Sequence, residues 1–488
     1  MNTHTAPHFY LWIHGEGRDG NVQAAEISNP FDGSLVGTVS MAGRRQIRDA
    51  IRSSQSACQT LKAMSRFQRA ELLLRMRDSL RDIRAELIDA LILEGGKPRM
   101  FAEQEFARTL ATFSWAAEEA RRFCGEQVPM DGMERGIGYE GYTRREPLGV
   151  IFGITPFNFP LNLVAHKVAP ALASGNAIII KPATNTPIAA LLMARVASAS
   201  GWPDGSVNVL PMRHRDVPLL LTDESVRMVS FTGSPDVGWQ LKRSVDKQRI
   251  TLELGGNSGS YVDCDADLAW AAERLVLGGF AQAGQSCIAV QRIYAHHQIF
   301  EPLLEMIVAQ AKATRAGNPR DADVIVGPVI SPEAAERIMA VIEEAVADGA
   351  RIACGGHRLD LGIGSVIEPT VLTNVHEGML VCSKEVFAPV ITVQPVNGID
   401  EAIKRINASP FGLQAAVFSR HLPTVQAAID RIETGGVIIN DFPTYRVDHM
   451  PYGGSKDSGL GREGIRSAMM EMSEPKMIAI RLEPRTEA

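Results

Sequence analysis

The sequence contains 488 residues, of which 45% are hydrophobic and 22% charged, and its formal net charge at pH 7 is -6. This composition is that of an ordinary globular protein, and the length allows two or three domains with well-filled cores. Because the net charge is small and no basic block occurs, we expect no nucleic-acid partner.

Residues 1–20 carry His, Glu and Asp among apolar residues and show no basic segment followed by a hydrophobic run, so no signal peptide is expected. Pro, Asn, His and Lys interrupt the most apolar region, residues 148–180, which argues against a membrane span. The six cysteines form no CxxC pair and no zinc-like spacing with histidine. We therefore expect a cytoplasmic protein with reduced thiols and no metal site.

Residues 22–42 alternate short apolar pieces with Asn-Pro and Asp-Gly, which predicts a hairpin or two short strands. Ser65 and Gln68 then form a capping-box pattern, and apolar residues follow at helical spacing until Gly95 and Gly96. One helix is predicted there, and a second amphipathic helix over 103–122. The polar, glycine-containing residues 127–145 predict a protruding hairpin.

Short apolar strands alternate with helical segments through the next hundred residues, which is typical of a parallel sheet covered by helices. Ligands of such sheets bind beyond the carboxyl ends of the strands. A second α/β unit is expected after residue 254, with helices at 267–280, 300–315 and 332–348. The strands of the first sheet are predicted at 148–154, 177–180, 207–210, 226–231 and 250–254, and its helices at 163–173, 188–200, 216–221 and 235–244.

Cys287 follows small residues and glutamines and precedes the strand-like run 288–294. A free cysteine is usually a small, inert hydrophobe. However, Glu253 ends the fifth predicted strand between two leucines, where burial would raise its pKa toward the range of a general base, although a glutamate at a strand end is usually solvated. The helix between them would bring both residues to one cleft, as covalent catalysis requires.

Three further motifs follow predicted strands. Asn158 stands in a turn stiffened by prolines, where its amide could donate to an oxyanion, or could only satisfy the turn backbone. Lys181 could contact a ribose hydroxyl or phosphate, or could be a surface lysine. Gly233 and Ser234 open a helix whose N-terminus suits an anion such as pyrophosphate, although the pattern is neither GxGxxG nor a P-loop.

Seven motifs in series make the chain resemble the NAD(P)-dependent aldehyde dehydrogenases over nearly its whole length. The resemblance extends to the branches that act on lactaldehyde, glyceraldehyde 3-phosphate, phosphonoacetaldehyde and sulfolactaldehyde. The motifs are TPFNFP (155–160), IIKPA (179–183), FTGS (231–234), ELGG (253–256), GQSC (284–287), EVFAPV (385–390) and PYGGSKDSGLGREG (451–464).

The resemblance implies that Cys287 attacks the aldehyde carbon, and that Asn158 and the Cys287 N–H hold the oxyanion. Hydride then leaves to the nicotinamide, and Glu253 activates the water that hydrolyses the resulting thioester to a carboxylic acid. It also implies the positions that contact the cofactor, which are Thr155, Pro156, Phe157, Lys181, Thr184, Gly233, Ser234, Leu254, Glu385 and Phe387.

The implied α/β fold has a Rossmann-like cofactor domain (1–126 and 146–254) and an α/β catalytic domain (255–465). A β-hairpin arm (127–145 and 466–488), with a strand expected over 477–482, would join the subunits of a homodimer or homotetramer. Members that prefer NAD often carry an acidic residue where this chain has Thr184. Because threonine does not repel a 2′-phosphate, we expect NADP to be accepted, with NAD as a further cofactor.

The expected substrate is a small aldehyde that is anionic or hydroxylated. Arg446 and His449 precede the PYGG motif, where the family presents a loop to the aldehyde, and the arginine fork suits phosphate, sulfonate or carboxylate. Phe159 and Ser286 complete the expected set, although branches for phosphorylated substrates tend to carry arginine in place of Ser286. Arg446 could instead pair with a nearby acid and shape the loop.

Three alternatives remain open: a general aliphatic or aromatic aldehyde dehydrogenase, a CoA-acylating relative and a non-catalytic relative on the same fold. Glu253 argues against the CoA-acylating class, whose members commonly lack this base. The joint presence of Cys287, Asn158 and Glu253 argues against a non-catalytic protein.

Overall fold

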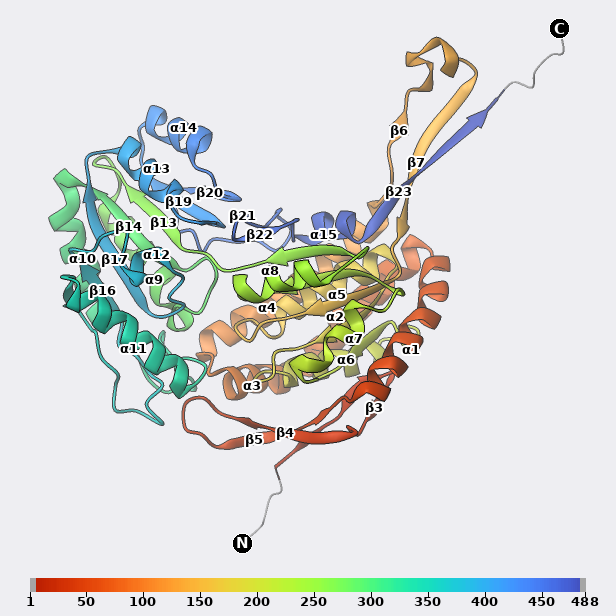
Figure 1. Cartoon of the computed structure of the whole chain (residues 1–488), viewed down its shortest axis with the longest axis horizontal. Coiled ribbons are helices and arrows are strands. Elements are labelled where there is room, and N and C mark those ends of the chain that lie inside the picture. The colour runs from red at the N-terminus through yellow and green to blue at the C-terminus, as the bar shows by residue number, and fades with distance from the viewer. Residues whose placement is uncertain (1–5, 483–488) are drawn as a thin grey trace.

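The computed structural model describes residues 6–482, which form two large sheets wrapped by helices and a projecting arm (Figure 1). The first sheet has eight strands in the order β22-β12-β11-β8-β9-β10-β2-β3. Its five central strands pair in parallel and confirm the five predicted strands. These strands are β8 (Val150–Ile154), β9 (Ala177–Lys181), β10 (Val207–Val209), β11 (Val226–Thr232) and β12 (Arg249–Glu253).

The edges of this sheet come from distant parts of the chain. β2 (Leu11–Ile13) and β3 (Glu16–Arg18) close one edge, and β22 (Gly459–Leu460) pairs antiparallel with β12 at the other. The predicted hairpin at 22–42 is confirmed as β4 (Val22–Ser28) and β5 (Leu35–Met41), which lie in a separate sheet with β1 (His8–Phe9).

Buried helices cover the first sheet. α5 (Asn162–Ser174) is buried along its whole length, so its apolar residues carry no helical stripe. The other helices of this region are α1 (Arg44–Ala63), α2 (Arg66–Asp82), α3 (Arg84–Gly95), α4 (Arg99–Arg122), α6 (Ile188–Ala199), α7 (Pro218–Leu221), α8 (Pro235–Ser244) and α15 (Ile465–Glu471).

The capping box at Ser65 is confirmed, since its hydroxyl accepts from the Gln68 N–H at 3.2 Å. The single helix predicted over the following thirty residues is wrong, because Ile83 leaves the helical conformation (φ -106°, ψ 23°) and separates α2 from α3. Ile83 is a member of the apolar stripe, so nothing in the periodicity marks this break. The prediction also missed α1 entirely and began α4 four residues too late.

The second sheet has seven strands in the order β15-β16-β17-β14-β13-β19-β20 and a core of its own. Its predicted helices are confirmed as α9 (Leu268–Phe280), α10 (Phe300–Ala313) and α11 (Pro332–Ala347). The remaining elements are β13 (Ser258–Val262), β14 (Val290–His296), β15 (Arg351–Cys354), β16 (Thr370–Thr373), α12 (Leu380–Ser383), β17 (Val390–Val396), α13 (Ile399–Asn407), β18 (Phe411–Gly412), β19 (Gln414–Phe418), α14 (Leu422–Arg431), β20 (Gly436–Ile439) and β21 (Ser455–Lys456).

The arm is a three-stranded antiparallel sheet in the order β23-β7-β6 that stands away from the body (Figure 1). β6 (Gln127–Val128) and β7 (Tyr139–Pro147) form the predicted hairpin, and β23 (Ser473–Arg481) pairs with all of β7. Both predicted features of the arm are therefore confirmed. No helix among residues 6–482 is both long and apolar enough to cross a membrane.

Candidate active site

Two cavities flank the turn that carries Asn158 and Phe159 and the turn that carries Ser286 and Cys287. The larger, about 560 Å³, lies at the carboxyl ends of β8, β9, β11 and β12 and is lined by Asn158, Glu253 and Cys287. The smaller, about 350 Å³, is lined by Phe159 and Ser286, the chain neighbours of two of these residues. Cys287 therefore sits where a cofactor and a substrate could meet.

The backbone just before Cys287 has an unusual run of positive φ angles. Gln282, Ala283 and Gly284 have φ values of 53°, 58° and 66°, a left-handed run that costs non-glycine residues about 1–2 kcal/mol each. Only glycine suits position 284, because a Cβ there would lie 2.0 Å from the Ala388 carbonyl oxygen. The following residues can then turn back toward the cavities before β14 begins.

The Cys287 sulfur lies 3.0 Å from the hydroxyl of Tyr452. Burial, together with the nearby carboxyl groups of Glu385 and Glu253, raises the pKa of the thiol to about 12. The hydrogen bond with Tyr452 and the charge of Arg446 act in the opposite direction. At neutral pH the resting group is therefore a thiol, which must lose its proton before attack.

Hydrogen bonds to the backbone hold the turn that carries Asn158. Its backbone carbonyl accepts from the Lys97 ammonium at 2.8 Å and from the Gln282 amide at 2.5 Å. Lys97 is itself buried in a pair with Glu105, whose carboxylate accepts from the N–H groups that follow the turn. The Asn158 side-chain amide donates to the Gln285 carbonyl at 3.0 Å, which leaves its second N–H for an oxyanion beside Cys287.

Glu253 is 4% exposed, and neither carboxyl oxygen has a hydrogen-bond partner among the described residues. Burial, followed by the neighbouring charge of Glu463, raises the pKa of Glu253 well above its usual value. Glu463 stays ionised because Lys167 and Arg446, at 3.2 and 3.3 Å, hold its pKa low. A carboxyl group in this state becomes a strong base once it loses its proton.

In the outer part of the larger cavity, several polar groups have few partners or none among the described residues. The Lys181 ammonium is buried, and within residues 6–482 it donates only to the Pro182 carbonyl, at 3.1 Å. Burial lowers its pKa to about 8. The Thr155 hydroxyl has no partner among the described residues. Ser234 caps α8 without a side-chain capping bond and lines the cavity with Val237, so the N-terminus of this helix lies at the cavity wall. These groups fit the riboses and pyrophosphate of a dinucleotide.

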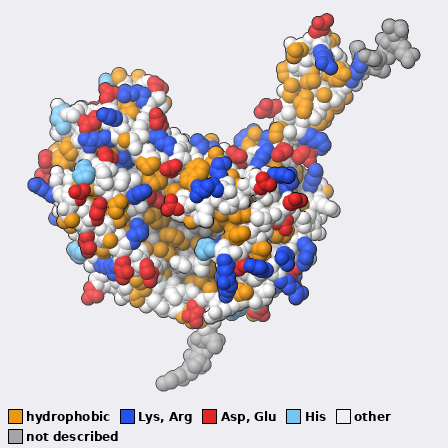
Figure 2. Space-filling model, in the orientation of Figure 1, with side chains coloured by type: hydrophobic (Ala, Val, Ile, Leu, Met, Phe, Trp, Pro, Cys, Tyr) orange, Lys and Arg blue, Asp and Glu red, His pale blue; other side chains and the backbone are white. Residues whose placement is uncertain are grey.

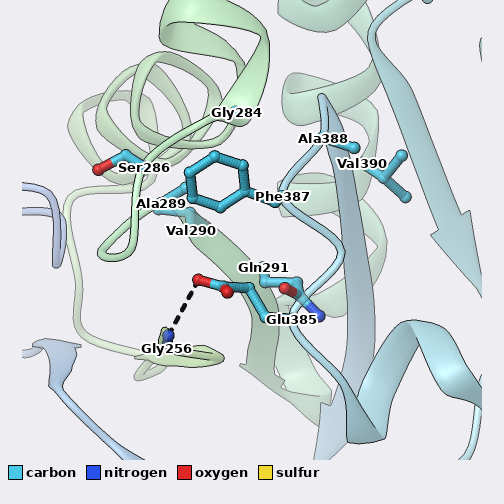
Figure 3. Close-up of a pocket in the computed structure, with 10 residues that line it drawn as sticks. All are labelled: Gly256, Gly284, Ser286, Ala289, Val290, Gln291, Glu385, Phe387, Ala388 and Val390. Carbon is cyan, nitrogen blue, oxygen red and sulfur yellow. Dashed lines mark hydrogen bonds between the residues drawn. The ribbon is translucent and has the colours of Figure 1, made fainter. Parts of the chain in front are cut away.

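Glu385 lines the larger cavity, and Figure 3 shows its side chain beside Gly256 and Phe387. Its carboxylate accepts from the Gly256 N–H at 3.0 Å, and burial raises its pKa to about 7. A Cβ at Gly255 would lie 2.3 Å from this carboxylate, and one at Gly256 would lie 2.3 Å from the Cys287 carbonyl oxygen, which explains the two glycines. The remaining predicted cofactor residues line the same cavity, and they are Pro156, Phe157, Thr184, Gly233, Leu254 and Phe387.

The residues expected to bind the substrate do not all line one cavity. Phe159, Ser286 and Arg446 line the smaller cavity. Arg446 also pairs with Glu463, which is the alternative that the sequence left open for this arginine. Its side chain nevertheless lines the cavity. His449 lies elsewhere: its exposed ring stacks on Trp115 with 4.2 Å between centroids, and it lines neither cavity.

Three residues of this region escaped prediction, and they are His214, Arg274 and Tyr452. His214 lines the larger cavity near Lys181, whose charge lowers the pKa of the imidazole. Arg108 and Arg274 line the smaller cavity and pair with Asp448 and Asp441. Neither His214 nor Arg274 stands in a recognisable motif. Tyr452 does stand in one, but its contact with Cys287 spans 165 positions.

Comparison with known proteins agrees with this geometry. Residues 17–478 match the aldehyde dehydrogenase family. The chain is 38% identical over 473 residues to a 3-sulfolactaldehyde dehydrogenase of Priestia aryabhattai, covering 97% of this chain and 98% of that protein. It is 35% identical over 476 residues to a lactaldehyde dehydrogenase of Methanococcus aeolicus, covering 96% and 99%.

Two solved structures are similar over almost the whole chain. Aldehyde dehydrogenase 21 from Physcomitrella patens, in complex with the reaction product succinate, has a TM-score of 0.95 and 37% identity, covering 98% of this chain and 99% of that one. The glyceraldehyde-3-phosphate dehydrogenase GapN of Methanocaldococcus jannaschii, complexed with NADP, has a TM-score of 0.90 and 35% identity, covering 94% and 100%.

The chain therefore belongs to the aldehyde dehydrogenase family. It is an oxidoreductase that oxidises an aldehyde to a carboxylic acid with NAD or NADP.

Proposed function

We propose that Cys287, Asn158 and Glu253 carry out this oxidation. The observation that supports the assignment is that one cavity brings together a cysteine, an amide with a free N–H and an unpartnered buried carboxyl group.

In the proposed sequence the Cys287 thiolate adds to the aldehyde carbon, and the Asn158 amide and the Cys287 N–H bind the oxyanion. A bound nicotinamide supplies the acceptor for the hydride that then leaves this carbon. Glu253, once ionised, takes a proton from the water that attacks the Cys287 thioester, and the carboxylic acid is released. Lys181, Thr155, Glu385 and the start of α8 hold the cofactor.

The cofactor choice depends on position 184. Replacing Thr184 by glutamate places a negative charge where the 2′-phosphate of NADP would bind, so we expect the ratio of kcat/KM for NADP to that for NAD to fall about 10- to 100-fold. Steady-state kinetics with both cofactors measures this ratio, and Thr184→Gln is the neutral control. An unchanged ratio in Thr184→Glu, or a clear preference of the native enzyme for NAD, would contradict the assignment.

We propose that the substrate is a small anionic aldehyde. Three arginines line the smaller cavity, and they are Arg108, Arg274 and Arg446. Arg108 pairs with Asp448, and Arg274 pairs with Asp441. Arg446 shares its partner Glu463 with Lys167, and its Nε atom is buried without a hydrogen bond. Sulfolactaldehyde and succinate, named for two of the similar proteins, are the kind of sulfonate and carboxylate compound that such a site would bind.

A panel of aldehydes tests this proposal. Anionic small aldehydes should exceed neutral aliphatic and aromatic ones in kcat/KM by a factor of about ten or more, about 1.4 kcal/mol, with NADP and without CoA. If neutral aldehydes such as lactaldehyde win, the site is a general one and the anion assignment fails. A dependence of turnover on CoA would favour the acylating class instead.

Arg446→Gln tests the residue behind this preference. The variant should lower kcat/KM for the best anionic aldehyde about 10- to 100-fold more than for a neutral one, because a charge-assisted, bidentate contact is lost only with the anion. The ratio between substrates is the relevant readout, since Arg446 also lies near Cys287 and Glu253. An equal loss for both substrates would assign Arg446 a structural role.

We also propose the division into a cofactor domain, a catalytic domain and an oligomerisation arm with the boundaries expected from the sequence. The two sheets and the separate arm support it. Apolar side chains gather on the arm (Figure 2), and the exposed ones include Met133, Ile137, Tyr139, Met477 and Ile480. A second subunit in a homodimer or homotetramer would cover them. Six free cysteines are consistent with a reducing, cytoplasmic location.

A further inference from the structure

The contact between Tyr452 and Cys287 has no part in the mechanism described above. The tyrosine is 4% exposed, and its hydroxyl lies 3.0 Å from the sulfur. Among the described residues, each of these two groups is the other's only side-chain hydrogen-bond partner. A buried tyrosine hydroxyl usually finds a partner, and here the partner is the nucleophile itself.

The ring of Tyr452 carries a second contact. The Arg446 guanidinium lies 3.8 Å from the ring centroid, and Glu463 accepts from the same guanidinium at 3.3 Å. A cation close to a phenol favours its ionised form and therefore makes the hydroxyl a stronger donor. Arg446, Tyr452 and Cys287 thus form a continuous path from the wall of the smaller cavity to the nucleophile.

We propose that Tyr452 is a further catalytic residue, whose hydroxyl donates a hydrogen bond to the Cys287 thiolate and holds the sulfur until it adds to the aldehyde. This inference rests on the proposed role of Cys287. A thiol can donate or accept, but a thiolate can only accept, so Tyr452 is the donor whenever Cys287 is ionised. The thiol proton leaves to water in the cavity, and the phenol keeps its own proton throughout.

The other surroundings of Cys287 make such a donor necessary. Burial opposes ionisation most strongly, and two carboxyl groups that face the sulfur, Glu385 and Glu253, add to this effect. The charged group that favours ionisation is Arg446, and the Tyr452 hydroxyl lowers the pKa of the thiol more than Arg446 does. Removing the hydroxyl should therefore make the thiolate rarer.

Tyr452→Phe removes the hydroxyl and keeps the ring under Arg446. The measurement is the rate of iodoacetamide alkylation of Cys287 against pH, followed by mass spectrometry of the Cys287 peptide so that exposed Cys124 and Cys264 do not interfere. We expect the apparent pKa to rise by about one to two units and alkylation near neutral pH to slow about 10- to 100-fold. Tyr10→Phe, at an exposed tyrosine, should leave the profile unchanged.

A Tyr452→Phe protein with the native pH profile would overturn the proposal. Replacement of Tyr452 by 3-fluorotyrosine, a more acidic phenol of nearly equal size, should shift the apparent pKa of Cys287 downward. This replacement is the deciding test if Tyr452→Phe does not fold. An unchanged profile with 3-fluorotyrosine would also count against Tyr452. Because alkylation requires no turnover, its result is separable from a failure of the Cys287 assignment, which Cys287→Ser tests by activity.

Discussion

Replacing Cys287 by serine is expected to lower kcat/KM for aldehyde oxidation by about 10⁴-fold or more. A hydroxyl is a far weaker nucleophile than a thiolate, and the cavity that holds Cys287 contains no histidine paired with it to activate a serine. The serine hydroxyl can still bond to Tyr452, so the loop should keep its shape. Initial rates of NADPH formation measure the loss.

The same variant should bind NADP with native affinity in a calorimetric titration, because the groups proposed to hold the cofactor are unchanged. Cys264→Ser is the matched control, since this exposed cysteine lies in neither cavity, and it should retain native activity. Dehydrogenase turnover in Cys287→Ser within tenfold of the native enzyme would refute the nucleophile assignment.

Replacing Glu253 by glutamine is expected to separate the two halves of the reaction. The variant keeps the nucleophile and the oxyanion donors, so it should release about one equivalent of reduced cofactor per subunit in a burst. Without the base, hydrolysis of the thioester should slow about 10²- to 10⁴-fold. Stopped-flow absorbance of NADPH resolves the burst from the slow phase, and Glu433→Gln, at an exposed glutamate, should behave as the native enzyme.

The pH dependence gives an independent check on Glu253. Burial and Glu463 hold its pKa well above the usual 4.5, so the carboxylate form is populated only as the pH rises through that raised value. Hydrolysis of the thioester by the native enzyme should therefore accelerate with rising pH, and Glu253→Gln should lose this rise. A variant that kept both native turnover and the native pH profile would remove Glu253 from the mechanism.

The parts of the fold that the sequence predicts are those with local signals. The capping box at Ser65, the apolar strands of the first sheet and the polar hairpin of the arm each depend on neighbouring residues, and the structure has all three. The break at Ile83 and the helix α1 escaped prediction. Ile83 continues the apolar stripe, and the N-cap of α1 is Gly43, which makes no side-chain capping bond.

The candidate site shows a similar limit. Motifs placed Asn158 and Glu253 after strands of a parallel sheet and Cys287 after a helix that returns to the same cleft, so their meeting could be expected. The left-handed backbone at Gln282 and Ala283 could not be predicted, because neither residue type favours positive φ. Tyr452, Arg446 and Glu463 meet through tertiary contacts near the nucleophile. The sequence alone left open whether Arg446 pairs with an acid or binds the substrate.

The mass of the Cys287 peptide in Glu253→Gln, quenched after mixing with NADP and the best aldehyde, tests the covalent route most directly. The account predicts that the peptide gains the mass of the acyl group, two hydrogens less than the intact aldehyde adduct, in proportion to the burst of NADPH. An unmodified Cys287 in a protein that has released one equivalent of NADPH would contradict it.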